Sequence, residues 1–309
     1  MLVVSTAIGD AAWCTVNRVE SLRWERRPAE LRSPVLVAAF RGWNDAGEAA
    51  TFAVGYLQAA LKAERFASVD PEEFFDFQSH RPRIHIANGD LQKPIGWPEI
   101  EVLETTADAE RQLILVNGIE PSMRWPTFTR GILDLAAELK VELVVTFGAL
   151  LADVPHTRPV RISGLSAPED LLNPLGLRRP DYEGPTGVVG TLHAAAVERG
   201  MRSASLWAAV PHYVGAAPCP NAALALLRAT QTLTGVTVSL TDLEQAVTQF
   251  EEQIDDAVRR NPQAANLVAD LERAYDREED QLFGPLPTGD AIAAEFERFL
   301  RERGGPEGE

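Results

Sequence analysis

Polar residues in loops that adjoin predicted buried strands are the part of this sequence best suited to chemistry. In an open α/β sheet, ligands bind at the carboxyl ends of the strands, so such loops can converge on one crevice. The candidates are Trp43, Asn44, Asp45, His156, Arg158, Thr186, Gly187 and His212. An Asp, a His and an Arg together could support hydrolysis of a nucleoside-like or acyl substrate, and backbone N–H groups at a helix start could bind an anion. The alternative interpretation is that these residues make structural hydrogen bonds within their loops.

The sequence does not supply these candidates with a recognisable nucleophile. It contains no Gly-x-Ser-x-Gly elbow, and no serine lies beside the candidate loops in a nucleophile context. We therefore predict no catalytic residue, and binding is favoured over catalysis.

Metal and phosphate sites also lack their usual spacings. No two of the five histidines form an HxxxH or HxH pair, and Cys14 and Cys219 match no CxxC pattern. The turn between Gly42 and Gly47 has neither a GxGxxG pattern nor the Lys-Ser/Thr pair of a phosphate-binding loop. We therefore predict no metal and no cofactor.

The elements that must position the candidates alternate between strands and helices. Val35 to Phe40 is an unbroken apolar run typical of a strand buried on both faces, and a Gly-rich turn and a helix from Ala46 follow it. The same alternation continues along the chain, with strands at 112–117, 141–147 and 204–210 and helices at 126–140, 186–199 and 220–233. This order predicts a three-layer α/β/α domain with a mostly parallel sheet over residues 1–238.

Residues 83–104 interrupt this order. Arg83 to Ala87 alternates as a strand, Asn88-Gly89-Asp90 is a turn signal, and Ile100 to Glu104 alternates again. We expect an antiparallel excursion that caps the main sheet or meets a partner. Trp97 within it is a candidate for an interface or for a hydrophobic plug.

The segment 239–309 has a different character. Apolar residues recur at spacings of three and four from Leu240 to Val258, Pro262 breaks the run, and a last helix is expected at about 288–303. The segment holds 18 acidic and 7 basic residues, so −11 of the net charge of −16 lies here. We predict an acidic helical extension whose apolar stripe packs on its own domain or on another chain.

Composition limits the function classes. A net charge of −16 argues against binding to nucleic acid or to an anionic membrane, because cations to replace phosphate counterions are not in excess. The chain has no apolar run of the roughly 18 residues that span a bilayer, and Asp10 interrupts the apolar N-terminus before it resembles a secretory signal. We expect a cytoplasmic protein.

Four segments carry a family resemblance. They are GWNDAG after the first buried strand, VPHTRPVRISG (Val154 to Gly164), YEGPTGVVGTLHAAAVERG (Tyr182 to Gly200) and SLWAAVPHYV (Ser205 to Val214). Their order and spacing between about Pro34 and Leu240 resemble the proteasome assembly chaperone family, in particular its second chaperone subunit and the bacterial branch. The resemblance implies a sheet like that of nucleoside phosphorylases and peptidyl-tRNA hydrolases.

The resemblance also implies a function. It favours a non-enzymatic assembly chaperone or scaffold that forms a homo-oligomer, a trimer, and that has proteasome subunits as partners. The alternative is a small-molecule enzyme of nucleoside phosphorylase or hydrolase type that uses the crevice at the strand ends. A phosphorylase needs a cationic phosphate site, and only Arg41 and Arg158 lie near the candidate loops.

Overall fold

The computed structural model describes residues 22–28, 30–88, 90–105, 110–177, 179–180, 182–214 and 218–283. The helix expected at 288–303 and the rest of the extension beyond 283 lie outside these residues. The chain divides into two compact units: unit 1 runs to Ala152 and resumes from Val160 to Phe250, and unit 2 comprises Asp153–Pro159 and the residues from Glu251 onward. The domain boundary at residue 239 stays a prediction.

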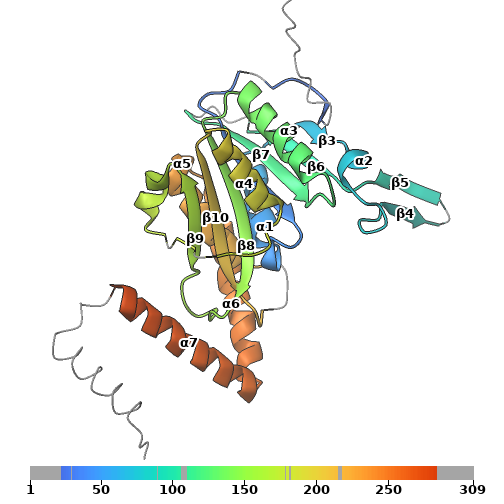
Figure 1. The fold of residues 1–309 in the computed structure, drawn as a ribbon. Coiled ribbons are helices and arrows are strands. Elements are labelled where there is room, and N and C mark those ends of the chain that lie inside the picture. Colours follow the sequence, from blue (N-terminus) through green and yellow to red (C-terminus); the bar gives the residue numbers. More distant parts are fainter. Residues whose placement is uncertain are drawn as a thin grey trace, which may run out of the picture. The chain divides into compact units, whose positions relative to one another are not determined.

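Unit 1 is built on one eight-stranded sheet (Figure 1). Its strands, in spatial order, are β1 (Leu22–Trp24), β3 (Glu64–Val69), β6 (Ile100–Glu104), β7 (Leu113–Ile119), β2 (Val35–Arg41), β8 (Leu143–Ala152), β10 (Ser203–Pro211) and β9 (Ile162–Ala167). The four central strands, β7, β2, β8 and β10, run parallel to one another. Antiparallel pairs extend the sheet on both sides.

Strand β2 shows why the sequence forms this sheet. Val35 to Phe40 are all fully buried, because helices cover both faces of the central strands. Alternate residues enter two separate hydrophobic clusters, with Val35, Val37 and Ala39 in one and Leu36, Ala38 and Phe40 in the other. An apolar run without polar alternation is what a strand buried on both faces requires.

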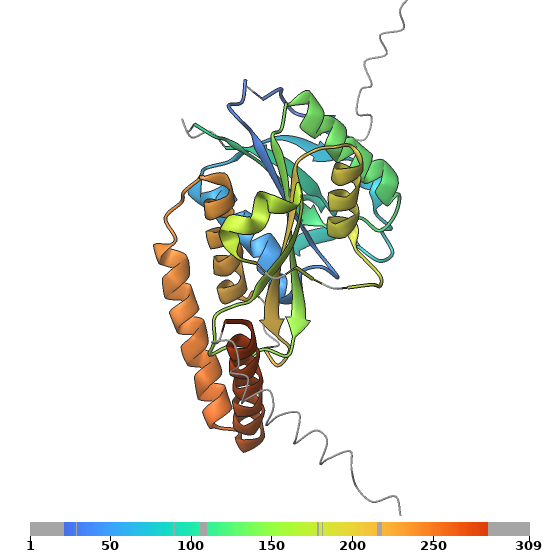
Figure 2. The ribbon, with the colours of Figure 1, turned by 60° about the vertical axis from the view of Figure 1, so that its left-hand side comes forward.

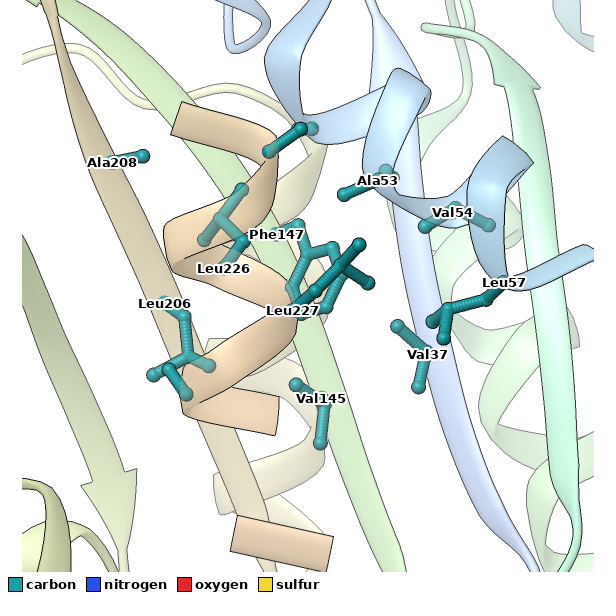
Figure 3. Packing of buried hydrophobic residues seen from close by; sticks show 14 of the residues in the cluster. Val37, Ala53, Val54, Leu57, Val145, Phe147, Leu206, Ala208, Leu226 and Leu227 are labelled. Atoms are coloured by element: carbon teal, nitrogen blue, oxygen red, sulfur yellow. The ribbon is translucent and has the colours of Figure 1, made fainter. Parts of the chain in front are cut away.

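The first cluster lies between the sheet and two helices, α1 (Ala49–Ala60) and α5 (Pro220–Thr234). Figure 3 shows Ala53, Val54 and Leu57 of α1 and Leu226 and Leu227 of α5 over the side chains of the central strands. A short 3-10 helix, η1 (Ala46–Glu48), precedes α1, and a second, η2 (Glu169–Leu175), follows β9.

The second cluster lies on the opposite face, under α2 (Pro71–Phe74), α3 (Trp125–Glu138) and α4 (Val188–Glu198). Phe128 of α3 makes edge-to-face contacts with Phe40, at 5.5 Å between ring centroids, and with Phe74, at 5.6 Å. The helix layers on the two faces of the sheet can be followed in Figure 2. The three-layer α/β prediction is therefore confirmed, with a sheet that is parallel in its centre.

The excursion between 83 and 104 folds differently from the expected pairing. Strand β4 (Arg83–Ala87) pairs with β5 (Asp90–Gly96), and these two form a separate antiparallel sheet, which we call the ribbon. Ile100 to Glu104 does not return along β4; as β6 it joins the main sheet between β3 and β7. Figure 1 shows the ribbon extending outward from the body of unit 1.

The C-terminal extension is helical over the residues described, as predicted. Helix α6 (Thr241–Arg259) contributes its first half to unit 1 and its second half to unit 2, and α7 (Pro262–Phe283) belongs to unit 2. The break falls at Pro262, where the Asn261 side chain accepts a hydrogen bond from the Gln263 N–H at 3.0 Å and caps α7. No helix within the described ranges is long and apolar enough to cross a membrane.

Candidate functional site

Asn44 and Gly187, two of the predicted residues, meet at a third residue that sequence analysis did not identify. The Asn44 Nδ2 donates a hydrogen bond of 2.6 Å to Oε1 of Glu120, and the Val188 backbone N–H donates one of 2.8 Å to the same oxygen. Asn44 is 1% exposed. We call this group, Asn44, Glu120, Gly187 and Val188, the Asn44–Glu120 network. It ties the loops after β2 and β7 to the start of α4.

Gly187 is required by the close approach of Asn44. A Cβ atom at position 187 would lie 2.0 Å from Nδ2 of Asn44 and 2.4 Å from its Oδ1. Side chains do not tolerate such distances, so only glycine lets the amide reach Glu120. Thr186, the other residue predicted at this helix start, lies against Gly190, where an added Cβ would come within 2.1 Å of Oγ1 of Thr186.

The network changes the interpretation of the anion site predicted at Thr186 and Gly187. Backbone N–H groups at a helix N-terminus do attract an anion, and here that anion is the chain's own Glu120 carboxylate. One signal in the sequence could have identified it: Glu120 directly follows Leu113–Ile119, a buried strand, and so occupies the carboxyl end of β7.

Asp45 caps the helix that follows it. Its Oδ1 accepts hydrogen bonds from the Ala50 N–H at 2.8 Å and the Thr51 N–H at 3.3 Å, at the first turn of α1. Burial raises the pKa of the Asp45 carboxyl above its ordinary value, and hydrogen bonds from Thr51 and Ala50 partly offset this effect. A carboxylate therefore lies where a phosphate-binding loop would place a phosphate.

Trp43 differs from the next two residues in solvent exposure. Its side chain is 65% exposed, whereas Asn44 and Asp45 are buried. The Asn44 carbonyl accepts a hydrogen bond of 2.7 Å from the Ala149 N–H, which holds this loop against β8. The loop thus directs two polar side chains inward and leaves the indole in solvent.

His156 and Arg158 belong to unit 2, where acidic residues of the C-terminal helices bind them. His156 Nε2 lies 3.0 Å from Oδ1 of Asp255 in α6. Arg158 makes a two-pronged ion pair with Asp276 in α7, with Nε–Oδ1 at 2.7 Å and Nη2–Oδ2 at 2.8 Å. Its Nη1 also contacts Glu272 at 3.2 Å. The three acidic partners were not predicted, because they lie about 100 residues away in the sequence.

The ion pair between Arg158 and Asp276 shifts the pKa values of both side chains. The hydrogen bonds to Asp276 raise the pKa of Arg158, and those from Arg158 lower the pKa of Asp276. Both side chains are therefore held charged. The predicted His-Arg loop acts in unit 2 as an anchor for the helices.

His212 lies at the end of β10 in unit 1. Its backbone N–H donates a hydrogen bond of 3.2 Å to the Ala152 carbonyl, and its ring lies edge-on to Tyr213 with centroids 5.7 Å apart. The eight predicted residues are thus divided between the two units, and within unit 1 Asn44 and Gly187 come from different loops and lie in contact.

A groove of about 1080 Å³ lies elsewhere in unit 1. Its lining residues, which include none of the eight predicted ones, come from the start of α1, the ends of β2 and β7, the loop before the ribbon and the ribbon's base. Aromatic surface is supplied by Phe52 and Trp97, and charges of both signs by Arg41, Arg81, Arg83, Glu48, Glu99 and Glu101. Such a mixed lining fits a polar and apolar surface better than a purely anionic ligand.

One histidine–serine pair lies near the groove and was not predicted. His80, which lines the groove, has its Nδ1 3.0 Å from Oγ of Ser122. Its ring also packs edge-on against Phe75. A buried pair, His193 Nδ1 and Ser203 Oγ at 2.8 Å, lies beneath α4, where burial lowers the pKa of His193.

Metal-binding chemistry finds no support in the parts of the chain that the structure describes. Within those parts, no three His, Cys, Asp or Glu residues are grouped so that they could hold an ion. Cys219 is a free thiol that is buried, and burial raises its pKa.

The fold and the site define a three-layer α/β protein in which most of the predicted crevice residues fasten loops and helices to one another. The profile of the PAC2 family matches residues 39–258, more than half of the chain. The chain therefore belongs to the PAC2 family.

Solved structures agree with this assignment. A PAC2 family protein from Streptomyces avermitilis is 45% identical, with a TM-score of 0.70 over 76% of this chain and 99% of that chain. A proteasome-assembly chaperone homologue from Mycobacterium tuberculosis is 40% identical, with a TM-score of 0.71 over the same shares. Pyrococcus furiosus PbaB, an archaeal proteasome activator, is 19% identical over 76% of this chain and 97% of that chain and shares the fold with a TM-score of 0.61. The comparison with curated proteins found no match.

Proposed function

We propose that this chain is a non-enzymatic protein-binding scaffold or assembly chaperone that acts in the cytoplasm as a homo-oligomer, a trimer, and has proteasome subunits as partners. The observation that carries the proposal is the 40% identity to the M. tuberculosis proteasome-assembly chaperone homologue, which extends over 99% of that chain. An assembly chaperone must present surfaces to other chains, and it needs no reacting group.

The geometry of the predicted residues supports binding over catalysis. Asn44, Asp45, His156 and Arg158 all hydrogen-bond to groups of this chain. The hydrogen bonds of Asn44, His156 and Arg158 connect segments far apart in the sequence, and that of Asp45 holds the start of the next helix; both roles serve a rigid scaffold. Binding surfaces must then be sought among other residues.

The direct test uses the full-length chain with purified proteasome subunits. We expect it to bind unassembled α-type or β-type subunits at micromolar concentrations and to speed the formation of assembled particles, as measured by native mass spectrometry over time. An unrelated protein of similar size and negative charge is the control, because a chain of charge −16 can associate through charge alone. Equal effects of the two proteins, or no binding of subunits, would contradict the proposal.

A second candidate, a small-molecule hydrolase, is favoured by one observation. The His80–Ser122 pair, at 3.0 Å beside a groove of about 1080 Å³, has the geometry of a base and a nucleophile. Against it, no carboxylate hydrogen-bonds to the Nε2 of His80 within the described ranges. Hydrolysis of acyl and nucleoside substrates that is lost in a Ser122→Ala variant would establish this candidate; equal rates in both proteins would remove it.

A further inference from the structure

One wall of the groove described above contains a glycine in the interior of a helix. Thr51, Phe52 and Gly55 of α1 line the groove, and Gly55 follows the other two by four and three residues, so all three lie on one face of the helix. A Cβ atom at Gly55 would meet no heavy atom within 4 Å. Glycine in a helix interior costs stability relative to alanine, and no close packing requires it at this position. Gly55 therefore keeps this wall of the groove open.

The floor of the groove holds a side-chain amide that is available to a ligand. Asn117 of β7 lines the groove and is half-buried. It pairs with Ala39 of β2, a member of the first cluster, so its side chain lies on the face of the sheet that α1 covers. Its amide makes no hydrogen bond to any described residue. Because a primary amide has both a donor and an acceptor, it can bind the N–H and C=O groups of a peptide.

The arginines of the groove lack carboxylate partners. Those that line it and form no ion pair within the described ranges are Arg41, Arg81 and Arg83. The chain has 45 acidic and 29 basic residues, so a shortage of carboxylates does not explain this lack. Acidic groups of a ligand would supply the partners that these arginines do not find in the described part of the chain.

The glutamates of the groove are mostly paired already. Glu99 and Glu101 both form ion pairs with Arg65, at 2.6 and 3.1 Å, and Glu25, which lies outside the groove lining, shares this arginine. The third groove glutamate, Glu48, has no ion pair to a described residue. The unpaired charges of the groove are thus three cations and one carboxylate, which favours an anionic ligand.

The groove also offers apolar surface and room. Phe52 and Trp97 line it, and Trp97 is 49% exposed although its ring centroid lies only 4.9 Å from that of Phe77. Its volume of about 1080 Å³ is at the upper end of the range for small-molecule sites. A ligand that matches the groove therefore combines carboxylates, apolar groups and peptide-like donors and acceptors.

We propose that this groove binds an extended segment of a partner protein in which acidic side chains alternate with apolar ones. The two kinds of side chain then point in opposite directions, the carboxylates toward the three arginines and the apolar groups toward the aromatic rings, while a peptide group bonds to Asn117. A nucleotide matches less well, because a triphosphate concentrates its charge in a groove that three glutamates also line. This inference rests on the proposed function and names the kind of segment that the scaffold recognises.

The test measures peptide binding to the full-length protein by fluorescence anisotropy. The probe is a fluorescein-labelled hexapeptide of sequence LEFELE, and in the control peptide lysine replaces each glutamate. We expect the acidic peptide to bind with a dissociation constant of about 100 µM or tighter and the basic peptide at least about 10-fold more weakly. ATP should not displace the acidic peptide; displacement by ATP would assign the groove to a nucleotide and overturn the inference.

Two substitutions on one helix show whether the peptide occupies the groove. Gly55→Gln adds a side chain that favours a helix and fills the open wall. Ala59→Gln places the same side chain at an exposed position of α1 outside the groove and is the matched control. We expect binding of the acidic peptide to weaken by about 10-fold or more in Gly55→Gln and to stay unchanged in Ala59→Gln, with the Tm of Gly55→Gln no lower than that of wild type.

A third variant keeps the test valid if the longer side chain disturbs α1. Arg41→Gln removes an exposed cation and should weaken binding of the acidic peptide by about 10-fold. A wild type that does not bind the acidic peptide overturns the inference, and so do equal affinities of wild type, Gly55→Gln and Arg41→Gln.

Proteasome subunits separate this inference from the proposed function. If subunits bind to wild type and Gly55→Gln alike, the chaperone proposal stands and the groove is not its site. If the acidic peptide binds in the groove but no subunit binds, the groove stands as a peptide site and the proteasome subunits are removed as its partners.

Discussion

The Asn44–Glu120 network and the ribbon distribute polarity in opposite ways. The network holds an amide that is 1% exposed against a carboxylate and a helix N-terminus, whereas the ribbon holds four aliphatic side chains that are 44% to 59% exposed. A buried polar group needs partners, and Glu120 supplies one to Nδ2 of Asn44, whereas the buried Oδ1 of Asn44 has none among the described residues. An exposed apolar face such as that of the ribbon is a candidate binding surface. The predicted polar residues Asn44 and Arg158 bond to groups of this chain, whereas the aliphatic side chains of the ribbon are exposed.

Breaking the network at its tightest contact should have the largest effect. Gly187→Ala would place a Cβ 2.0 Å from the Asn44 amide and displace it from Glu120. We expect the free energy of unfolding to fall by about 3 kcal/mol, from overpacking and a lost buried hydrogen bond, with Tm lower by about 5–10 °C. Thermal and urea unfolding measure this.

The matched control for this glycine is Gly55→Ala. Gly55 lies within α1, and an added Cβ would meet no heavy atom within 4 Å. The change should leave stability unaltered or raise it by about 0.5–1 kcal/mol, since alanine favours a helix. Equal losses at the two positions would show that the Asn44 contact contributes nothing specific.

Removing the carboxylate should have the next largest effect. Glu120→Ala leaves the buried Asn44 Nδ2 and the Val188 N–H without their acceptor, at a cost of about 2 kcal/mol in the free energy of unfolding. Glu120→Gln keeps an acceptor oxygen and loses only the charge near the helix N-terminus, so we expect a loss of about 1 kcal/mol or less. Urea unfolding of both variants separates hydrogen bonding from charge; a glutamine variant as unstable as the alanine one would assign the effect to charge.

The pH dependence of stability tests the burial of Asp45. Burial raises the folded pKa of this carboxyl above its ordinary value of 3.8, so its contribution to stability is fully present below that value and is lost as pH rises through the folded pKa. Asp45→Asn removes the titration. We expect the variant to gain stability relative to wild type as pH rises above 3.8, as measured by urea midpoints. A difference that is constant with pH would contradict the raised pKa.

Exposed polar contacts should contribute least to the free energy of unfolding. Comparing one of them with the buried network tests whether burial sets the size of the effect. Arg158→Ala removes the ion pair with Asp276, a contact in solvent. We expect faster amide hydrogen exchange in residues 153–159 with little change in Tm. Arg259→Ala, which removes an ion pair with Asp256 in the same helix, is the control and should leave exchange in this loop unchanged. A loss of stability as large as that of Gly187→Ala would end the distinction between the two kinds of contact.

The fold was predictable where one physical pattern acts alone. The apolar run at Val35–Phe40, the helical spacing of α3 and the break at Pro262 all follow from local periodicity and chain geometry. Strand β5 was missed because Pro94 and the bulges opposite β4 interrupt the alternation that identifies a strand. Trp97, predicted as a candidate for an interface or a hydrophobic plug, is half exposed, and its ring centroid lies 4.9 Å from that of Phe77.

For the candidate site, the sequence predicted which polar residues follow the strands, but not which residues they hydrogen-bond to. Asn44, His156 and Arg158 are polar residues in loops after strands, as an α/β sheet requires. Their partners Glu120, Asp255 and Asp276 come from distant segments. No local spacing encodes a contact across 76 or 118 residues.

The sequence by itself determined the alternation of strands and helices around the central sheet, the acidic helical extension over its described residues and the family, because periodicity, charge and motif order are properties of the chain. Tertiary structure decided which polar groups hydrogen-bond to one another, because such a bond depends on the approach of segments that are far apart in the sequence. It also decided that the ribbon stands outside the main sheet. The physical reason is strand pairing, because β4 and β5 hydrogen-bond to each other whereas β6 pairs with β3 and β7.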